Sequence, residues 1–238
     1  MQLFYAPRIS GEFHELDEQE SRHAVRVLRL SKGEKVVLVD GTGGWYECEI
    51  AEAHPKRCRL EIRTRTPDHN PLPYDLHIGI SPTRSTDRFE WFLEKATEIG
   101  ISEITPLICH RTERSRLNYE RLQRIIVSAM KQSLRAYKPA LSEPVRFDRF
   151  LKGRHSGTLG IAHCQSGDRI SLEELKPSGR YTLLIGPEGD FTDDEIDSAV
   201  SAGYIPFHLG ESRLRTETAG IYVCSVVRSV LSAKTSDF

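Results

Sequence analysis

Two glycine-rich segments near the C-terminus carry residue types that suit the binding of a ligand. IGPEGDF (Ile185–Phe191) and LGESRLRTETAG (Leu209–Gly220) each follow a short apolar run that is typical of a β-strand. Glycine lets the backbone turn sharply and approach a ligand closely, and ligands of open α/β sheets bind beyond the carboxyl ends of the strands. The two segments therefore predict the walls of a ligand pocket.

A plain turn is the alternative for the first segment. Gly186–Gly189 would suit a turn, and Thr192 with Glu195 forms a capping box that could begin any helix. The second segment favours the pocket, because the stretch from Gly210 to Thr216 is longer than the roughly 2 to 6 residues of an ordinary αβ connection.

Together the two segments resemble the C-terminal pattern of the SPOUT class of knotted RNA methyltransferases. They are most similar to the family that methylates N3 of a uridine in small-subunit ribosomal RNA, whose pattern is close to GPEGGF followed by LGxRILRTETA. The chain departs from this pattern at Asp190, where Gly is usual, and at Ser212 and Arg213, where Arg and Ile are usual. The matching positions are Gly186, Pro187, Glu188, Gly189, Phe191, Leu209, Gly210, Leu214, Arg215, Thr216, Glu217, Thr218 and Ala219.

The resemblance implies S-adenosylmethionine as the cofactor. Its adenine needs apolar walls and backbone groups, and its methyl group must be aimed at the acceptor. Glu188 or Glu217 could reach polar groups of the cofactor. The residues expected to bind it are Leu184, Ile185, Gly186, Pro187, Glu188, Gly189, Leu209, Gly210, Leu214, Thr216, Thr218 and Ala219.

The implied acceptor, N3 of uracil, is an imide nitrogen that is weakly nucleophilic until its proton leaves. The resulting anion spreads over two carbonyl oxygens, and Arg215 is the candidate catalytic residue that stabilises it. Glu217 is the candidate that accepts the proton. A structural role for Glu217, in capping the final helix or pairing with an arginine, is the alternative.

Composition bounds the class of protein. The 238 residues are 38% hydrophobic and 28% charged, with a net charge of -1, which excludes a uniformly basic surface for nucleic acid but leaves room for a local basic face. Five cysteines without a CxxC motif predict reduced thiols in the cytoplasm and no metal site. No apolar run is long enough for a signal peptide or a membrane span.

A domain boundary is expected within Thr64–Asp75, where three prolines interrupt the patterned sequence. Upstream, Lys35–Ile50 predicts a β-hairpin and Cys58–Thr66 a strand, so residues 1–70 are expected to form a small β-barrel. The resemblance implies a PUA-like RNA-binding barrel there. It also implies that residues 71–238 form a SPOUT methyltransferase domain with a trefoil knot.

The alternation of apolar and amphipathic runs downstream of the boundary predicts an α/β domain, with a mostly parallel sheet and helices on both faces. The expected strands are Asp75–Ile80, Ile104–Cys109, Thr158–His163, Tyr181–Ile185 and Ile205–Leu209. The expected helices are Asp87–Ile99, Asn118–Arg135, Leu172–Lys176, Asp193–Ala202 and Thr216–Ala233.

Two segments with basic residues at helical spacing predict contacts with RNA. No acidic residue lies between Arg121 and Arg135, so ion pairs within that helix cannot neutralise its basic stripe. A solvated helix face is the alternative there, and an amphipathic helix packed on the barrel is the alternative for Arg22–Leu30. The expected RNA-binding residues are Arg22, His23, Arg26, Arg29, Arg121, Arg124, Lys131 and Arg135.

The resemblance thus implies an S-adenosylmethionine-dependent methyltransferase for uridine N3 of small-subunit ribosomal RNA, acting on that RNA or on the 30S particle. The resemblance also implies a homodimer. One alternative is a knotted methyltransferase of the same class that acts on another base or on transfer RNA. The other is a noncatalytic RNA-binding module, which the departures at Asp190 and Ser212 keep open.

Overall fold

The computed structural model describes residues 2–231, which form two compact units. The first unit contains the described residues up to Pro71 together with Val127–Lys138, and the second contains Leu72–Ile126 and the described residues from Pro139 onward. Burial explains why the segment Val127–Lys138 belongs to the first unit. Met130 and Ala136 are buried in one apolar cluster with Leu3, Val37, Val39 and Trp45.

The first unit is built on a curled five-stranded sheet in the order β1-β3-β4-β5-β2. Its strands are β1 (Leu3–Tyr5), β2 (Phe13–Glu15), β3 (Lys35–Val39), β4 (Trp45–Glu52) and β5 (Arg59–Thr66). The expected hairpin is confirmed, since β3 and β4 pair antiparallel. The Asp40 carboxylate closes the turn between them by accepting the N–H groups of Thr42 and Gly44 at 2.7 and 3.0 Å.

A short helix, α1 (Glu18–Arg22), and the π-helical turn His23–Val27 precede this hairpin. Val25 and Leu28 pack against the core of the first unit, as the amphipathic alternative anticipated.

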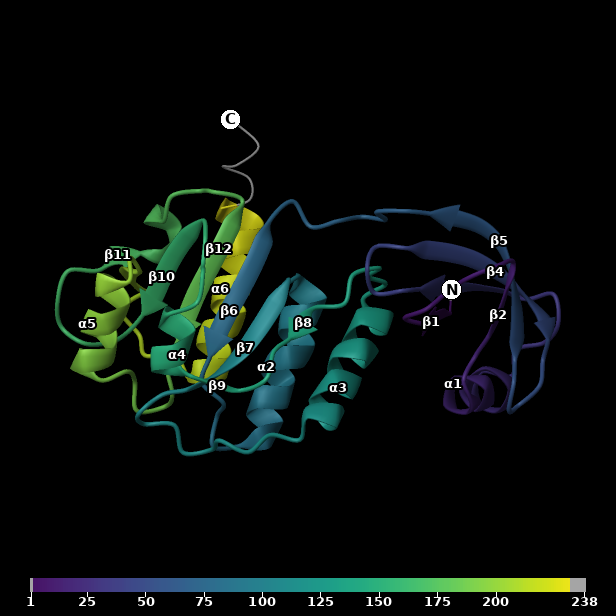
Figure 1. The fold of residues 1–238 in the computed structure, drawn as a ribbon, viewed down its shortest axis with the longest axis horizontal. Coiled ribbons are helices and arrows are strands. Elements are labelled where there is room, and N and C mark those ends of the chain that lie inside the picture. Colours follow the sequence, from purple (N-terminus) through teal and green to yellow (C-terminus); the bar gives the residue numbers. More distant parts are fainter. Residues whose placement is uncertain (1, 232–238) are drawn as a thin grey trace. The chain divides into compact units, whose positions relative to one another are not determined.

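The second unit contains an eight-stranded sheet in the order β11-β13-β10-β12-β6-β7-β8, with β9 also pairing to β7 (Figure 1). Every pairing in it is parallel, which confirms the predicted sheet type. Its strands are β6 (Asp75–Ile80), β7 (Glu103–Ile108), β8 (Ala140–Leu141), β9 (Val145–Arg146), β10 (Thr158–Ala162), β11 (Ile170–Ser171), β12 (Arg180–Ile185) and β13 (Ile205–His208).

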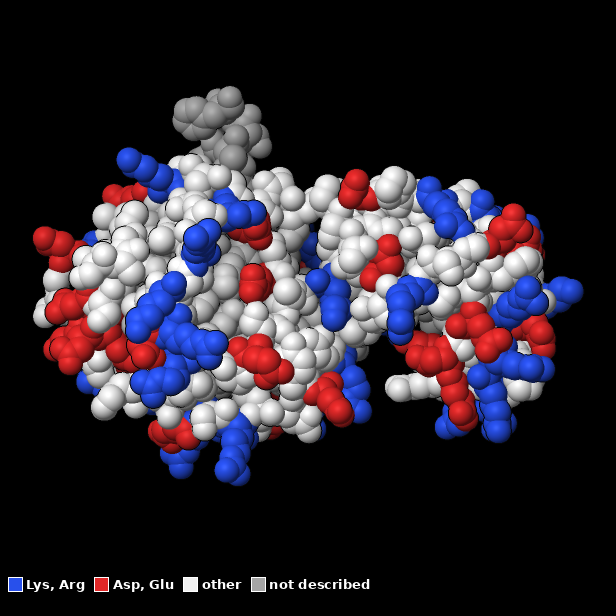
Figure 2. Space-filling view, viewed as in Figure 1, with Lys and Arg blue, Asp and Glu red and all other residues white. Residues whose placement is uncertain are grey.

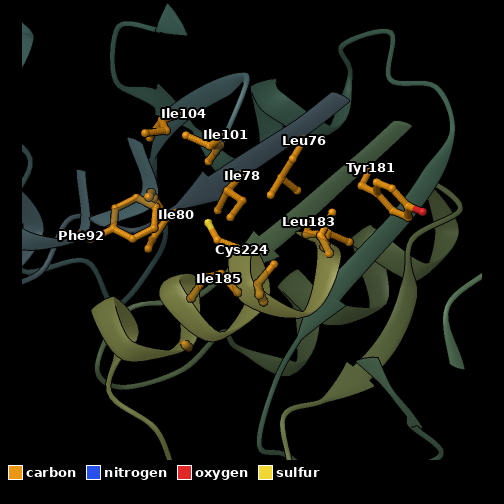
Figure 3. Packing of buried hydrophobic residues seen from close by; sticks show 14 of the residues in the cluster. Leu76, Ile78, Ile80, Phe92, Ile101, Ile104, Tyr181, Leu183, Ile185 and Cys224 are labelled. Carbon is orange, nitrogen blue, oxygen red and sulfur yellow. The ribbon is translucent and has the colours of Figure 1, made fainter. Parts of the chain in front are cut away.

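Helices cover both faces of this sheet. They are α2 (Thr86–Ile99), α3 (Tyr119–Gln132), α4 (Phe147–Leu151), α5 (Asp193–Ser201) and α6 (Thr216–Val226). On one face, side chains of α2 and α6 pack on the strands, and Figure 3 shows Ile80, Leu183 and Ile185 around Cys224 of α6. On the other face, Phe147 and Ile196 of α4 and α5 belong to a second apolar cluster.

The helix boundaries differ from the expected ones where local geometry intervenes. Leu172–Glu174 is a single 3-10 turn, and α3 ends at Gln132, before Leu134 with its φ of 54°. The final helix changes to a π-helical turn at Val227–Leu231, and the expected residues 232–233 lie outside the described range. Helix α4 was not predicted, because five residues are too few to show a helical period. No helix within residues 2–231 is long and apolar enough to cross a membrane.

Candidate cofactor-binding site

Three loops of the second unit line a cavity of about 420 Å³. The loops follow β10, β12 and β13, which are neighbours in the parallel sheet, so their carboxyl ends meet at one edge. The volume lies within the usual range for small-molecule sites, about 300–1,000 Å³. Two of the loops are the glycine-rich segments that the sequence singled out.

The first loop begins where the buried strand β12 ends. The N–H of Asp190 donates to the carbonyl oxygen of Pro187 at 2.9 Å and closes a tight turn. A side chain at Gly186 would place its Cβ 3.1 Å from ring carbons of the buried Phe191 and 3.2 Å from its backbone nitrogen. A larger residue at position 186 would therefore need Phe191 or the loop to shift by a few tenths of an ångström.

Positive φ in this loop falls on Asp190, at 65°, the position where the resembled family usually has glycine. Aspartate is among the few residues that tolerate this left-handed conformation. The Asp190 carboxylate accepts the N–H of Cys164 at 2.8 Å and the N–H of Phe191 at 2.8 Å. The departure from the family pattern thus keeps the turn and adds a hydrogen bond to the loop after β10.

Substitution of Asp190 should separate the contribution of its hydrogen bonds from that of its backbone conformation. We expect Asp190→Ala to lower the free energy of unfolding by about 2 kcal/mol, since alanine loses both hydrogen bonds and resists positive φ. Asp190→Gly should cost less, about 1 kcal/mol, because glycine adopts positive φ freely. Urea unfolding measures both values, and equal losses would show that the backbone conformation contributes nothing.

The second loop runs from β13 into α6 and is tied to the first. The buried Thr216 hydroxyl donates to the carbonyl oxygen of Gly186 at 3.0 Å. Gly210 has a φ of 104°, and its N–H donates to Nδ1 of His208 at 3.2 Å. Here glycine supplies the positive φ that lets the chain turn out of the strand.

The third loop, residues 162–169, was not predicted as part of the site. Its His163 is only 7% exposed, and neither ring nitrogen has a hydrogen-bond partner among the described residues. Arg169 donates from Nη1 to the carbonyl oxygen of His163 at 2.6 Å, and its buried Nε has no partner in the same range. Burial, and secondly the charge of Arg169, lower the pKa of His163. The available sequence signal was a strand ending in a histidine followed by polar residues.

Most of the expected cofactor-binding residues line this cavity. They are Ile185, Gly186, Pro187, Glu188, Gly189, Leu209, Gly210, Leu214, Thr216 and Ala219. Leu184 instead lies buried in the apolar cluster with Leu107 and Phe191, because successive strand residues point to opposite faces. Thr218 is exposed on α6 and is not among the lining residues.

The two candidate catalytic residues are placed differently. Arg215 lines the cavity at the N-cap of α6, exposed to solvent. Glu217 does not line it and is only 6% exposed in the first turn of α6. Its Oε1 lies 3.8 Å from Nε of Arg88, while Oε2 has no hydrogen-bond partner within residues 2–231. The arginine contact matches the structural alternative, but the second oxygen stays available.

Glu188 connects the cavity to a neighbouring loop. Its Oε1 accepts the backbone N–H of Arg84, which follows β6, at 2.9 Å. Arg111, after β7, donates to the carbonyl oxygens of Gly189 and Phe191 at 2.6 and 3.2 Å. These contacts hold the first loop from its outer side.

The basic stripe on α3 is partly neutralised by acidic residues of other elements. Arg121 makes two bonds to the Glu90 carboxylate, at 2.6 and 2.8 Å, and Lys131 is paired with Glu20. These acidic partners come from other elements, so spacing within the helix could not reveal them. Figure 2 shows both basic and acidic side chains on the visible face of each unit.

Several other expected RNA-binding residues remain exposed. Arg124, His23, Arg26 and Arg29 are exposed and have no ion pair in the described part of the chain, whereas Arg22 pairs with Glu18 at 2.8 Å. Arg135 is half-buried. Arg124 is therefore the clearest candidate on α3 for contact with a phosphate.

We expect Arg124→Ala to weaken RNA binding. The slope of the logarithm of the binding constant against the logarithm of the salt concentration should fall by about one unit, which corresponds to one lost phosphate contact. The matched control is the double variant Arg121→Gln with Glu90→Gln, which removes a neutralised pair at constant net charge. The salt dependence of RNA binding by this double variant should equal that of the wild type. An unchanged slope in Arg124→Ala would show that this residue faces only solvent.

Comparison with known proteins agrees with this architecture. The family described as RNA methyltransferase domain matches residues 70–228, and the RNA methyltransferase PUA domain matches residues 16–63. Ribosomal RNA small subunit methyltransferase E from Synechocystis is 30% identical over 216 residues, which cover 87% of this chain and 70% of that protein.

Solved structures agree as well. A probable rRNA-methyltransferase from Porphyromonas gingivalis has a TM-score of 0.91 at 36% identity and covers 98% of this chain and 100% of that one. Ribosomal RNA small subunit methyltransferase E from Neisseria gonorrhoeae, bound to S-adenosyl methionine, has a TM-score of 0.88 at 28% identity and covers 96% and 97%. The fold class implied by the resemblance is confirmed, with a PUA-like unit before a methyltransferase unit. The chain belongs to the RNA methyltransferase family that includes the proteins named ribosomal RNA small subunit methyltransferase E.

Proposed function

We propose that this protein transfers the methyl group of S-adenosylmethionine to N3 of a uridine in small-subunit ribosomal RNA. The observation that carries the proposal is the three-loop cavity at the carboxyl edge of the parallel sheet, in a chain of this family. The names of its relatives, which specify the ribosomal small subunit, support the substrate class.

The cavity fits S-adenosylmethionine in size and in chemistry. Ile185, Leu209 and Leu214 offer apolar surface, and Gly186 and Gly210 leave the backbone open to close approach. The buried and unpaired groups of the third loop require a polar partner, which a cofactor with polar ends supplies. When bound, the cofactor provides the activated methyl group.

The chain must provide charge stabilisation and a proton acceptor. Arg215, at the rim of the cavity, presents a planar guanidinium that suits an anion spread over two carbonyl oxygens. Glu217 is the candidate acceptor of the N3 proton, but it is buried outside the cavity lining, with Oε1 3.8 Å from Nε of Arg88, so its unpaired Oε2 would have to turn toward the cavity to take this role. Both side chains belong to the start of α6, so one rigid element positions them.

The substrate is tested by methyl uptake from labelled S-adenosylmethionine into purified 30S particles, naked small-subunit RNA and bulk transfer RNA. We expect uptake by 30S particles or small-subunit RNA and none by transfer RNA. Uptake by transfer RNA alone would select the alternative of another RNA substrate. Calorimetry that finds no binding of S-adenosylmethionine would select the noncatalytic alternative.

We also propose that the protein is a cytoplasmic homodimer, that its methyltransferase domain contains a trefoil knot, and that it uses no metal. The family resemblance supports these proposals. Light scattering at micromolar concentration tests the dimer, and a mass equal to one chain would contradict it. In the proposed function, the PUA-like unit contributes RNA contacts through Arg26 and Arg29, which are exposed.

A further inference from the structure

The third loop of the cavity carries buried polar groups that no other described part of the chain satisfies. His163 is 7% exposed, and its Nδ1 and Nε2 both lack a hydrogen-bond partner within residues 2–231. The buried Nε of Arg169 lacks one as well. Both residues line the cavity. Buried polar groups in native proteins are nearly always paired, so a cluster of unpaired ones inside a ligand cavity indicates that a ligand pairs them.

The Arg169 side chain and the backbone of the third loop are held in place before any ligand arrives. Arg169 donates from Nη1 to the carbonyl oxygen of His163 at 2.6 Å, which fixes the guanidinium against its own loop. The N–H of Cys164 donates to Oδ2 of Asp190 at 2.8 Å, which ties the third loop to the first. A preorganised donor group loses little conformational freedom on binding, so its hydrogen bonds contribute more to affinity.

The chemistry of S-adenosylmethionine identifies the partner. Its sulfonium and ammonium groups are cationic and repel an arginine, and its adenine and ribose are neutral. The α-carboxylate is its only anionic group, and a guanidinium binds a carboxylate through charge-assisted hydrogen bonds. Arg213 and Arg215 also line the cavity, but both are exposed to solvent. Neither has a buried N–H group that lacks a hydrogen-bond partner.

We propose that Arg169 and His163 bind the α-carboxylate of S-adenosylmethionine, Arg169 as the ionic partner and His163 as a hydrogen-bond donor. The inference rests on the proposed function, because it assumes that this cofactor enters the cavity. It assigns the amino-acid end of the cofactor to the loop after β10. Asp190 is a positioning residue in this arrangement, since it holds the loop through Cys164.

Decarboxylated S-adenosylmethionine provides the test, because it keeps the adenosine, the sulfonium and the amine and lacks only the carboxylate. Calorimetry compares the two ligands on the full-length wild type, Arg169→Ala, Arg169→Lys and His163→Gln. The wild type should prefer S-adenosylmethionine by about 10- to 100-fold, the usual strength of a charge-assisted hydrogen bond. Arg169→Ala should lose most of this preference and bind the decarboxylated ligand as the wild type does.

The remaining variants sharpen the test. Arg169→Lys should recover only part of the preference, because an ammonium lacks the planar fork. His163→Gln should lose less than Arg169→Ala. The matched control, Arg149→Ala, removes an exposed arginine of the second unit that does not line the cavity and should keep the full preference. Thermal unfolding of each variant shows that it is folded.

Each outcome decides between the proposals. If Arg169→Ala weakened the binding of both ligands equally, or weakened the binding of neither, the carboxylate assignment would be overturned. In both cases wild-type binding of S-adenosylmethionine leaves the proposed function standing. A wild type that binds neither ligand would overturn the proposed function and the inference together.

Discussion

Gly186→Val is expected to abolish binding of S-adenosylmethionine, lowering the affinity by about 100-fold or more, which corresponds to roughly 3 kcal/mol. The Cβ of any side chain there would lie 3.1 Å from ring carbons of Phe191 and 3.2 Å from its backbone nitrogen. Phe191 is fully buried, so its ring has little room to give way, and we expect the loop to shift. The displaced loop also carries the carbonyl oxygen that Thr216 binds, which links the two glycine-rich segments.

Gly189→Val is the matched control for this prediction. Both glycines line the cavity, and neither has a positive φ. A Cβ at Gly189 would meet only side-chain carbons of Arg111, from 3.2 Å, so this side chain and its bonds to the loop carbonyl oxygens must adjust, but no buried ring is displaced. We therefore expect a loss of less than about 10-fold, under 1.4 kcal/mol. Calorimetry measures both variants, and wild-type affinity in a folded Gly186→Val would show that the first loop is only a turn.

The second large effect is expected at Arg215. Arg215→Ala should lower the rate constant of methyl transfer by about 100- to 1,000-fold, the usual cost of losing a group that stabilises a developing anion. The affinity for S-adenosylmethionine should change far less, because the interaction is made to the acceptor base. Arg215→Lys should recover little of the rate, since a point charge cannot match two carbonyl oxygens as a planar fork does.

Single-turnover measurements with saturating cofactor check this prediction, because they isolate the chemical step from product release. Arg149→Ala serves as the control, since Arg149 is an exposed arginine of the second unit that does not line the cavity. A full rate of methyl transfer in Arg215→Ala would remove this residue from the mechanism. A loss confined to the affinity for the cofactor would assign it to binding instead.

The two glycine-rich loops could be predicted because their signals are local. A buried strand, a glycine at its end and a capping box lie within a few residues of one another, and the capping box of Thr192 and Glu195 forms as expected. The parallel sheet followed from the alternation of elements along the chain. Burial of Leu184 away from the cavity follows from strand alternation, which the resemblance did not resolve.

The third loop could not be predicted, because its place depends on strand order. His163 and Arg169 belong to the site because β10 lies between β12 and β13 in the sheet. No short segment of the sequence indicates which strands are neighbours. The partners of the basic stripe were missed for the same reason, as Glu90 and Glu20 approach α3 from distant elements. The reason that an aspartate suits position 190 could be recognised only from its φ of 65° in the structure.

The position of the transferred methyl group tests the central claim most directly. Small-subunit RNA lacking the modification is incubated as 30S particles with enzyme and S-adenosylmethionine, and its nucleosides are then separated and identified by mass. The proposed function predicts 3-methyluridine at a single site, where the methyl blocks Watson–Crick pairing and stops reverse transcriptase one nucleotide earlier. Gly186→Val and Arg215→Ala should give far less product and a much weaker stop than the wild type after the same incubation. Methyl found instead on C5 or on a ribose 2′-oxygen would contradict the imide mechanism, and no methyl in small-subunit RNA would contradict the proposed function itself.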